Sequence, residues 1–354
     1  ISIAGCMLDG APMLQGCMDN SLNDPLGKVS EEELGRDGFA ANAFFLTLCD
    51  YAYPIATENI YNTNESLIGD CYGRYQVMAT DKFKGANFAT YNAPENWLNW
   101  QFADDNVMVL TYGAWNKIKN VTQGTGVNFA WAQILRIATM HRMLDMYGAL
   151  PYSQISSDKL SAPYDTMEEA YHAMFTDLTD AINVMTVYVT ENPNNRTMAK
   201  YDKVYDGDFE KWVKFANSLK LRMAIRIRFA DREYARQMAE EAINHSIGVI
   251  TSNEDNATSL GTKNQLYTVL VQWPDQCVSA DITSYMKGYN DPRMSKYFKK
   301  KTSDKGDDDY VGMRAGLSYG NDITGPTFSR INVGEMDRTL WMSAAETAFN
   351  KAEA

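Results

Sequence analysis

The segment Ser218–Ala230, SLKLRMAIRIRFA, sets the strongest constraint on how this chain folds. Apolar residues occupy every second position from Leu219 to Phe229, and basic residues fill most of the gaps between them. A period of two is typical of a half-buried β-strand. The segment has no Val, Thr or Tyr, however, and its Leu, Lys, Arg, Met and Ala residues all favour helices. Taken alone, the segment fits either structure.

The residues before this segment favour a helix. Asp208 is placed to cap a helix N-terminus by accepting a backbone N–H bond. No Gly or Pro occurs between Gly207 and Gly248. We therefore expect a helix over residues 209–230 and another over residues 232–245. An apolar stripe recurs along the first helix at spacings of three and four: Trp212, Ala216, Leu219, Met223 and Ile227.

The expected helix 209–230 is apolar on two faces. On a helical wheel, Leu221 and Ile225 lie opposite the stripe that contains Trp212, and basic residues follow the seams between the faces. A surface helix needs only one apolar face, whereas a helix with two is packed between layers. We therefore predict a mainly all-α fold: a tetratricopeptide-like helical-repeat scaffold with long loops and few short strands.

Two further helices and two irregular regions are predicted. Residues 128–148 form a helix that stops at Gly148. Thr166 and Glu169 make a capping box at the start of the next helix. Residues 67–100 are rich in Gly, Asn and aromatic residues, which indicates a long functional loop. Residues 248–276 are expected to be strand or loop.

The composition excludes one class of partner and leaves the role of the aromatic residues open. The net charge of −12 argues against nucleic acid, which requires a basic surface. The chain has 7 Trp, 21 Tyr and 14 Phe residues, most of which core packing explains. The alternative is that some of these rings are exposed as a platform for a ligand.

The first residues are typical of an export signal. Small and apolar residues lead to Leu14-Gln15-Gly16-Cys17, which resembles the lipobox of bacterial lipoproteins; Cys6 is a poorer competing site, and a disordered N-terminus is the alternative. We expect residues 1–17 to be a signal remnant lipidated at Cys17, 18–35 a linker, and 36–354 the helical domain, truncated at its C-terminus. An odd number of remaining cysteines favours buried free thiols: Cys49, Cys71 and Cys277.

No motif for catalysis, a metal or a cofactor is found. The three histidines lie far apart, and a local hydrogen bond between His141 and Asp145 is the simplest role for the first of them. The acidic run 304–310 lacks the EF-hand order and is interpreted as a solvated loop. Carboxylate pairs for glycoside hydrolysis meet only in space, so the sequence does not exclude them. We expect a protein that is not an enzyme and needs no cofactor.

Several stretches together resemble the SusD/RagB-type outer-membrane lipoproteins, the SusD-like family. The resemblance runs from about Leu34 to the C-terminus. The chain departs from the family pattern at Asp9, inside the apolar run of the signal, and at Cys71, in the stretch GDCYGRY. It depends on the following stretches: ANAFFLTLCDYAYP, ESLIGDCYGRY, WAQILRIATMHRMLDMYGALPYSQI, YDGDFEKWVKFANSLKLRMAIRI, YMKGYNDPRMSKYF and MSAAETAFNKAEA.

The resemblance implies a non-catalytic receptor for nutrient uptake, lipid-anchored at the cell surface in the outer membrane. Such proteins cover a SusC-like TonB-dependent transporter and deliver oligosaccharides to it, as in polysaccharide utilisation, although some relatives take peptides. Two rival hypotheses remain: a peptide receptor of the same architecture, and a helical-repeat scaffold that binds no nutrient ligand. Binding of a glycan without hydrolysis would support the oligosaccharide receptor. Copurification with an outer-membrane barrel would separate both receptor hypotheses from the scaffold hypothesis.

The expected sugar site combines indole rings with polar side chains. A sugar presents an apolar C–H face, which stacks on an aromatic ring, and a rim of hydroxyls. We expect the ligand to contact five residues, although Trp97 and Trp100 fit packing under the loop equally well: Trp97, Asn99, Trp100, Tyr267 and Trp273. Asn59, Tyr72 and Arg74 are weaker candidates. Trp115, Trp131 and Trp212 lie on helical stripes and are assigned to the core.

Overall fold

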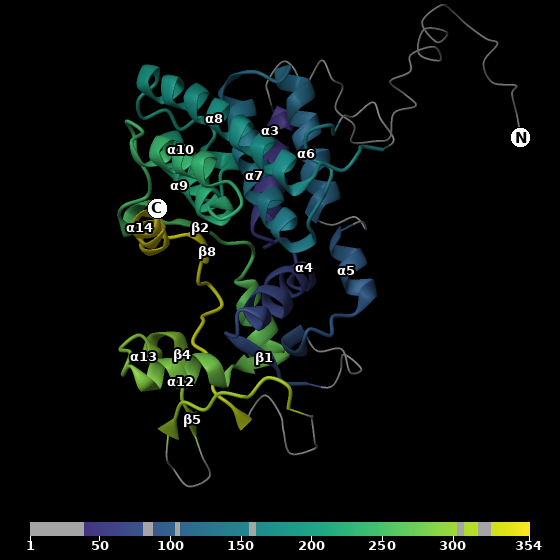
Figure 1. Cartoon of the computed structure of the whole chain (residues 1–354), viewed down its shortest axis with the longest axis vertical. Coiled ribbons are helices and arrows are strands. Elements are labelled where there is room, and N and C mark those ends of the chain that lie inside the picture. The colour runs from purple at the N-terminus through teal and green to yellow at the C-terminus, as the bar shows by residue number, and fades with distance from the viewer. Residues whose placement is uncertain (1–38, 81–87, 103–106, 156–160, 303–307, 318–326) are drawn as a thin grey trace, which may run out of the picture.

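Long helices stacked side by side form one half of the molecule, here called the helical lobe. The computed structural model describes residues 39–80, 88–102, 107–155, 161–302, 308–317 and 327–354. Neighbouring helices in the sequence pack against each other, as expected for stacked hairpins (Figure 1). The helical lobe contains α3 (Phe39–Ala52), α6 (Val107–Thr122), α7 (Gly126–Tyr147), α8 (Met167–Glu191), α9 (Phe209–Ile227), α10 (Arg232–Ile243) and α14 (Ala344–Glu353).

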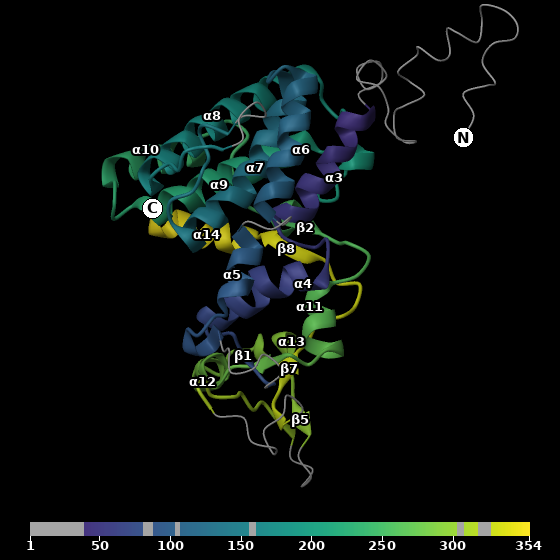
Figure 2. The same cartoon turned by 90° about the vertical axis from the view of Figure 1, so that its right-hand side faces the viewer.

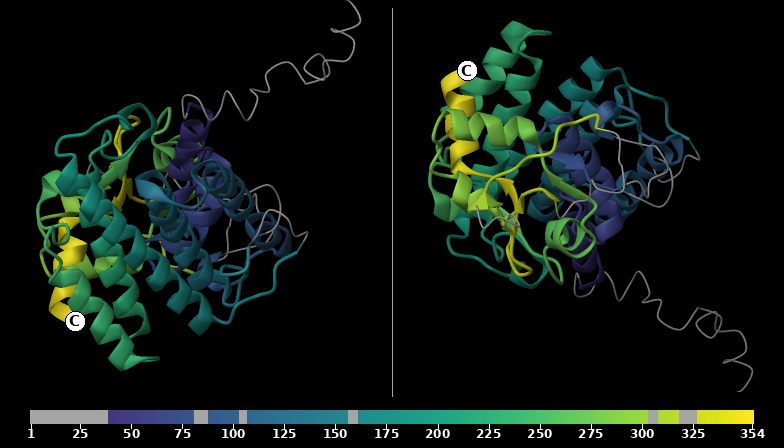
Figure 3. Two further views of the ribbon diagram at one scale, coloured as in Figure 1. Left: turned by 90° about the horizontal axis from the view of Figure 1, so that it is seen from above. Right: turned by 90° about the horizontal axis from the view of Figure 1, so that it is seen from below.

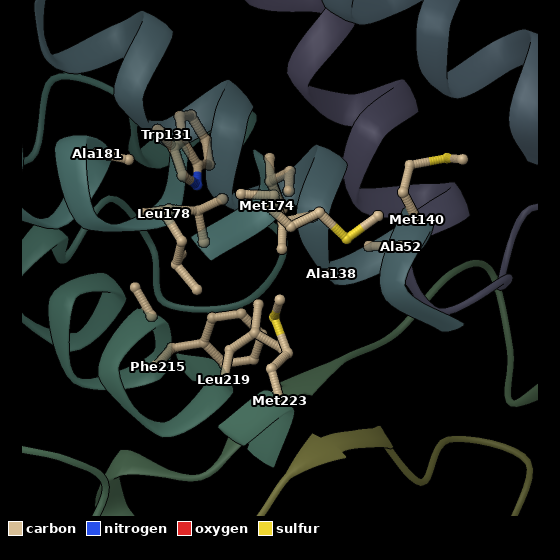
Figure 4. Close-up of a cluster of buried hydrophobic side chains, with 14 of the residues drawn as sticks. Ala52, Trp131, Ala138, Met140, Met174, Leu178, Ala181, Phe215, Leu219 and Met223 are labelled. Atoms are coloured by element: carbon tan, nitrogen blue, oxygen red, sulfur yellow. The ribbon is translucent and has the colours of Figure 1, made fainter. Parts of the chain in front are cut away.

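The ambiguous segment is a helix packed between other helices, as predicted. Asp208 caps α9 by accepting a hydrogen bond from the backbone N–H of Lys211. Trp212 and Leu219 on one face and Leu221 on the other are all fully buried. Helix α9 packs against α8, α10 and α14, so both apolar faces are covered. Phe215, Leu219 and Met223 on one face point toward Met174 and Leu178 of α8 (Figure 4). It ends at Ile227, earlier than expected, and Phe229 beyond it is 88% exposed.

Ion pairs between helices explain the basic residues along the seams of α9. Lys220 pairs with Glu241 of α10, Arg226 pairs with Asp145 of α7, and Arg228 pairs with Glu353 of α14. Arg222 pairs with Glu346 of α14 and also donates hydrogen bonds to the Tyr53 hydroxyl and the Trp341 carbonyl. The alternation of apolar and basic residues in this segment therefore reflects basic side chains that form ion pairs with neighbouring helices.

Aromatic rings fill the centre of the helical lobe. The Trp212 ring lies 5.7 Å from the Trp131 ring and 6.1 Å from the Trp341 ring, measured between centroids. Trp115 is also buried, so all three tryptophans assigned to the core are confirmed. Seen along the long axis, the helices follow chain order across the layer, from α3 on one side to α10 and α14 on the other (Figure 3).

The structure confirms the predicted capping box, the predicted helix stop at Gly148 and the predicted free thiols. The Thr166–Glu169 capping box is present, and Gly148 terminates α7 with a φ of 78°. Cys49, Cys71 and Cys277 are buried free thiols. The expected bond between His141 and Asp145 is wrong. His141 Nδ1 donates to the Ile137 carbonyl at 2.8 Å, and Asp145 instead accepts from Tyr171 and Arg226.

The other half of the molecule, here called the loop lobe, is built from short elements (Figure 2). Its described residues fall between 58 and 102 and between 264 and 335. Its elements are α4 (Glu58–Tyr61), the π-helical η2 (Asn62–Asp70), β1 (Gln76–Met78), the 3₁₀ turn η3 (Phe88–Thr90), α5 (Glu95–Phe102), α11 (Gln265–Tyr267), the π-helical η6 (Thr268–Gln272), β3 (Gln276–Val278), α12 (Ala280–Gly288), α13 (Met294–Tyr297), β4 (Phe298–Lys299), β5 (Lys301–Thr302), β6 (Asp308–Asp309) and β7 (Arg330–Ile331).

Among the residues that the structure describes, the strands pair only in twos. Segments β1 and β3 pair antiparallel, with Val77 opposite Cys277; β4 pairs with β7, and β5 with β6. A fourth pair, between β2 (Ala257–Ser259) and β8 (Thr339–Met342), lies beside the helical lobe. The few short strands of the prediction are confirmed.

Two predictions for the irregular regions need correction. Residues 67–100 were expected to form a loop, but they include the end of η2 and most of α5. Residues 265–272 were expected to be strand or loop, but they are helical as α11 and η6. In both regions the helical pieces are too short for a periodic pattern to reveal them.

The predicted lipobox, Cys17 and the linker 18–35 lie outside the described residues. Within the described ranges, no helix combines the length and the apolar composition that a membrane-spanning segment requires.

Candidate functional site

A small apolar core, separate from that of the helical lobe, supports one face of the loop lobe. It joins η2, β1, η3 and β3 across almost the whole length of the sequence. The buried side chains that form it include Leu67, Ile68, Cys71, Val77, Met78, Phe88, Cys277 and Met313. Burial raises the pKa of the Cys277 thiol to about 12, so the thiol stays neutral in this core. Residues attached to this core are held in place even where their own side chains are exposed.

Trp97 lies half-buried against this core. It belongs to α5, and its ring centroid is 5.8 Å from that of Phe88. Asn99, two residues further along α5, is exposed. Trp100 lies on the same helix, but its side chain is outside the described part of the chain. Trp97 therefore contributes to packing and presents only part of its ring to solvent.

Trp273 is more exposed, with 38% of its surface accessible. It follows η6, and its backbone N–H donates to the Thr268 carbonyl at 2.9 Å. Two residues later, the Asp275 carbonyl accepts a bond from the N–H of Ala79 at the end of β1. The backbone on the two sides of Trp273 is therefore held by η6 and by the residue that follows β1.

Tyr267 lies at the other end of η6 from Trp273. It ends the short helix α11, where its N–H donates to the capping side chain of Asn264 at 3.1 Å. The ring is half-buried, and α11 packs against α4 and η2 at the junction of the two lobes. Tyr267 directly precedes η6 and Trp273 directly follows it, whereas Trp97 lies on α5.

A pair of tyrosines on the supported face includes one residue that the sequence analysis missed. Tyr72 is 38% exposed and Tyr91 is 66% exposed, and their ring centroids lie 5.1 Å apart. Tyr72 follows the buried Cys71, and the N–H of Tyr91 donates to the carbonyl of Phe88, so both are fixed to the core. Tyr91 has a φ of 59°, which no local pattern predicted.

Arg74 lies beside this tyrosine pair. Its backbone has a φ of 61°, and its N–H donates to the Cys71 carbonyl at 3.2 Å. Its guanidinium is 3.8 Å from the carboxylate of Asp281, and both side chains are about half exposed. Asn59, the third of the weaker candidates, is exposed on α4 at the junction between the lobes.

A cavity of about 580 Å³ opens beside β1 and β3. Its lining includes Tyr61, Tyr75, Gln76, Tyr297 and Asp70. Burial, reinforced by the charge of Glu65, raises the pKa of Asp70 to about 7. The Asp70 carboxyl accepts a hydrogen bond from the Gln76 amide at 3.1 Å. The wall combines apolar and aromatic side chains with charged ones, among them Lys296, Asp337 and Arg338.

The described side chains provide no obvious metal site. Within the ranges that the structure covers, no group of three or more His, Cys, Asp or Glu residues is arranged to hold an ion. His141 is buried, and burial lowers its pKa to about 3, with Arg222 adding to the effect. The acidic run 304–310 lies largely outside the described residues.

Comparison with known proteins gives one family and a set of similar structures. A family model described as SusD-like, "Susd and RagB outer membrane lipoprotein", matches residues 21–354. A SusD homolog from Bacteroides uniformis is 36% identical, with a TM-score of 0.81 over 90% of this chain and 66% of its own. A SusD-like protein from Bacteroides thetaiotaomicron is 33% identical, with a TM-score of 0.78 over 88% of this chain and 64% of its own.

A chitin-binding SusD homolog from Flavobacterium johnsoniae is 32% identical, with a TM-score of 0.77 over 88% of this chain and 65% of its own. The chain thus spans slightly less than two thirds of the length of these relatives. No match was found among curated proteins.

Proposed function

The chain belongs to the SusD-like family of outer-membrane lipoproteins, and from this premise we propose that it binds oligosaccharides at the cell surface without cleaving them. The exposed face of the loop lobe is the proposed binding surface. Trp273, Trp97 and the Tyr72–Tyr91 pair supply the rings, and Asn99 supplies a polar side chain. Trp100 and Tyr267 complete the set of expected contacts.

One observation carries this proposal: aromatic rings remain exposed on a lobe whose core is already closed. Tyr91 and Trp273 are 66% and 38% exposed, whereas Phe88 and Met78 in the small core of the same lobe are fully buried. Single exposed rings are common on protein surfaces, but several exposed aromatic rings on one lobe are typical of a binding surface. A sugar face covers such a ring, and Tyr and Trp rings also tolerate the polar rim.

The family and one relative support a carbohydrate as the ligand. The Flavobacterium johnsoniae homolog is described as chitin-binding and shares 32% of its sequence with this chain. We propose that the ligand is passed to a SusC-like TonB-dependent transporter, and that a lipid on Cys17 holds the protein at the outer membrane. Membership of a family of outer-membrane lipoproteins supports this part of the proposal.

The test is binding by the intact protein to an array of glycans and peptides, followed by titration calorimetry with each positive probe. We expect a glycan to bind, with no release of reducing sugar during incubation. Trp273→Ala and Tyr91→Ala should each weaken binding at least tenfold, about 1.4 kcal/mol. Phe229→Ala is the matched control, because Phe229 is 88% exposed on the helical lobe.

Three outcomes contradict parts of the proposal. Binding of peptides but not glycans indicates the peptide receptor. Release of reducing sugar that stops on mutation of one Asp or Glu indicates an enzyme. Failure to bind any probe, together with no copurification of an outer-membrane barrel from cells, leaves the scaffold hypothesis.

A further inference from the structure

Helix α12 exposes a second pair of tyrosines that the proposed site does not use. Tyr285 is 69% exposed and Tyr289 is 79% exposed. Their ring centroids lie 5.9 Å apart, with the ring planes tilted by 31°. The Tyr72–Tyr91 pair has a similar arrangement, 5.1 Å apart and tilted by 37°. Two pairs of exposed rings with nearly the same geometry therefore lie on one lobe.

The opposite side of α12 is firmly attached to the lobe. Thr283 and Met286 are buried, and the Ser279 side chain caps the helix by accepting from the N–H of Asp281 at 3.1 Å. A Cβ added to Gly312 would lie only 2.3 Å from the Ser279 carbonyl oxygen, so only glycine allows this close approach. The helix is held rigidly while its tyrosine face stays open.

An ion pair connects the two tyrosine pairs. Asp281, Tyr285 and Tyr289 follow one another at intervals of four residues, which places them on one face of α12. The N–H of Tyr289 donates to the Tyr285 carbonyl at 3.1 Å, which preserves the helical spacing at the end of α12. Asp281 at the start of this face pairs with Arg74, which is two residues from Tyr72. The Arg74–Asp281 ion pair therefore joins the segment that carries Tyr72 to the helix that carries Tyr285 and Tyr289.

We infer that Tyr285 and Tyr289 form a second stacking platform and that the ligand is an oligosaccharide long enough to lie across both platforms. This inference rests on the proposed function. From Asp281 to Tyr289 alone, the face extends about 12 Å at 1.5 Å per residue. The half-exposed Arg74 and Asp281 side chains then contact sugar hydroxyls between the two platforms.

The charges of this surface favour a neutral ligand. Arg74 and Asp281 neutralise each other, and Lys287 near the end of α12 pairs with Asp309 at 2.7 Å. A paired guanidinium and carboxylate still offer N–H donors and oxygen acceptors, which is what hydroxyl groups require. A strongly charged peptide or acidic glycan finds no uncompensated charge of opposite sign among these groups.

The experiment measures affinity as a function of ligand length. Titration calorimetry uses the di-, tetra- and hexasaccharides of chito-, cello-, malto- and xylo-oligosaccharide series with the whole protein. We expect one series to bind with an affinity that rises with length. In the double variant Tyr285→Ala/Tyr289→Ala, the hexasaccharide should bind about tenfold more weakly while the disaccharide binds as before.

Two control variants separate stacking from other effects. Tyr285→Phe/Tyr289→Phe keeps the rings and should retain the gain in affinity with length. Phe229→Ala removes an exposed ring from the helical lobe and should change nothing. Circular dichroism and thermal unfolding check that each variant is folded. We expect all variants to fold, because both tyrosine side chains are largely exposed.

The outcomes distinguish this inference from the proposed function. If the double variant binds all lengths as the wild type does, the second platform is wrong and the proposed function stands. If the variant keeps its sugar affinity but no longer copurifies with a membrane partner, α12 is a protein contact and the inference is also wrong. If the wild type binds no oligosaccharide of any kind tested, both proposals fail together.

Discussion

The two lobes use the same residue type in opposite ways. Trp212 of the helical lobe is completely buried, and its indole N–H donates to the Asp202 carboxylate at 2.7 Å. Trp273 of the loop lobe is 38% exposed and follows a short π-helical segment. The Trp212 ring is surrounded by other aromatic rings, including those of Trp131 and Trp341, whereas part of the Trp273 ring is open to solvent.

The difference shows that the layers around a ring, more than the ring itself, decide its role. Helix α9 presents two apolar faces, which α8, α10 and α14 cover, and Trp131 of α7 and Trp341 of β8 pack against the Trp212 ring. The loop lobe has strands of only a few residues and no second helical layer over Trp273 among the segments that the structure describes. Removing each ring should therefore affect a different property of the protein.

Trp212→Ala should give the largest effect and test the first half of this comparison. Removal of a fully buried Trp leaves a cavity and costs about 3–5 kcal/mol of folding free energy. Loss of the indole N–H also leaves the buried Asp202 with one hydrogen bond fewer, at about 1–3 kcal/mol. Urea unfolding measures the change, and a loss below about 1 kcal/mol would contradict the sealed core.

The pH dependence of stability should have opposite signs in the two lobes. His141 has a pKa of about 3, lowered mainly by burial from its ordinary 6.5. Between these values only the unfolded chain binds the proton, so the contribution of His141 to stability is lost as pH falls through this range. Asp70 has a pKa of about 7, raised mainly by burial from 3.8. Here only the native state keeps the proton, and stability is lost as pH rises from about 4 to about 7.

Variants that remove each titrating group check these signs by urea unfolding at several pH values. Relative to the wild type, Asp70→Asn should gain stability as pH rises, and His141→Gln should gain stability as pH falls. The slopes should be on the order of 1 kcal/mol per pH unit. Stability curves that run parallel to that of the wild type would show that neither group titrates differently on folding.

The helical lobe could be predicted from sequence because its signals are local and repeated. The stripe through Trp212, the cap at Asp208 and the capping box at Thr166 each lie within a few residues of the structure they specify. The partners of the basic residues on α9 could not be predicted. Arg222 and Glu346 are separated by 124 positions, and only the fold brings them together.

The loop lobe was harder to predict because its contacts are distant and its elements short. Gln76 pairs with Val278 across some two hundred residues, and no periodic pattern marks a strand of three residues. Trp273 could be chosen as a ligand contact from its residue type and its loop. Tyr91 could not, because its exposure depends on a left-handed backbone conformation with a φ of 59°. The i, i+4 spacing of Tyr285 and Tyr289 was readable, but their exposure was not.

The loss of stability in Trp97→Ala should lie between the losses in Trp212→Ala and Trp273→Ala. Trp97 packs half-buried against the small core beside Phe88, so its loss should cost about 1–3 kcal/mol of stability. In the proposed site it should also weaken sugar binding, whereas Trp97→Phe should restore most of the stability. Urea unfolding and calorimetry on both variants check this. Loss of stability with unchanged binding would assign Trp97 to packing alone.

Trp273→Ala should give the smallest change in stability and is the sharpest test of the comparison. The ring is partly exposed, and the backbone bonds that fix its segment, such as its own N–H to the Thr268 carbonyl, do not involve the side chain. We therefore expect less than about 1 kcal/mol of lost stability, the usual range for exposed positions. Sugar binding should nevertheless fall at least tenfold. A variant that loses several kcal/mol of stability would show that Trp273 belongs to a core, as Trp212 does, and the contrast between the lobes would disappear.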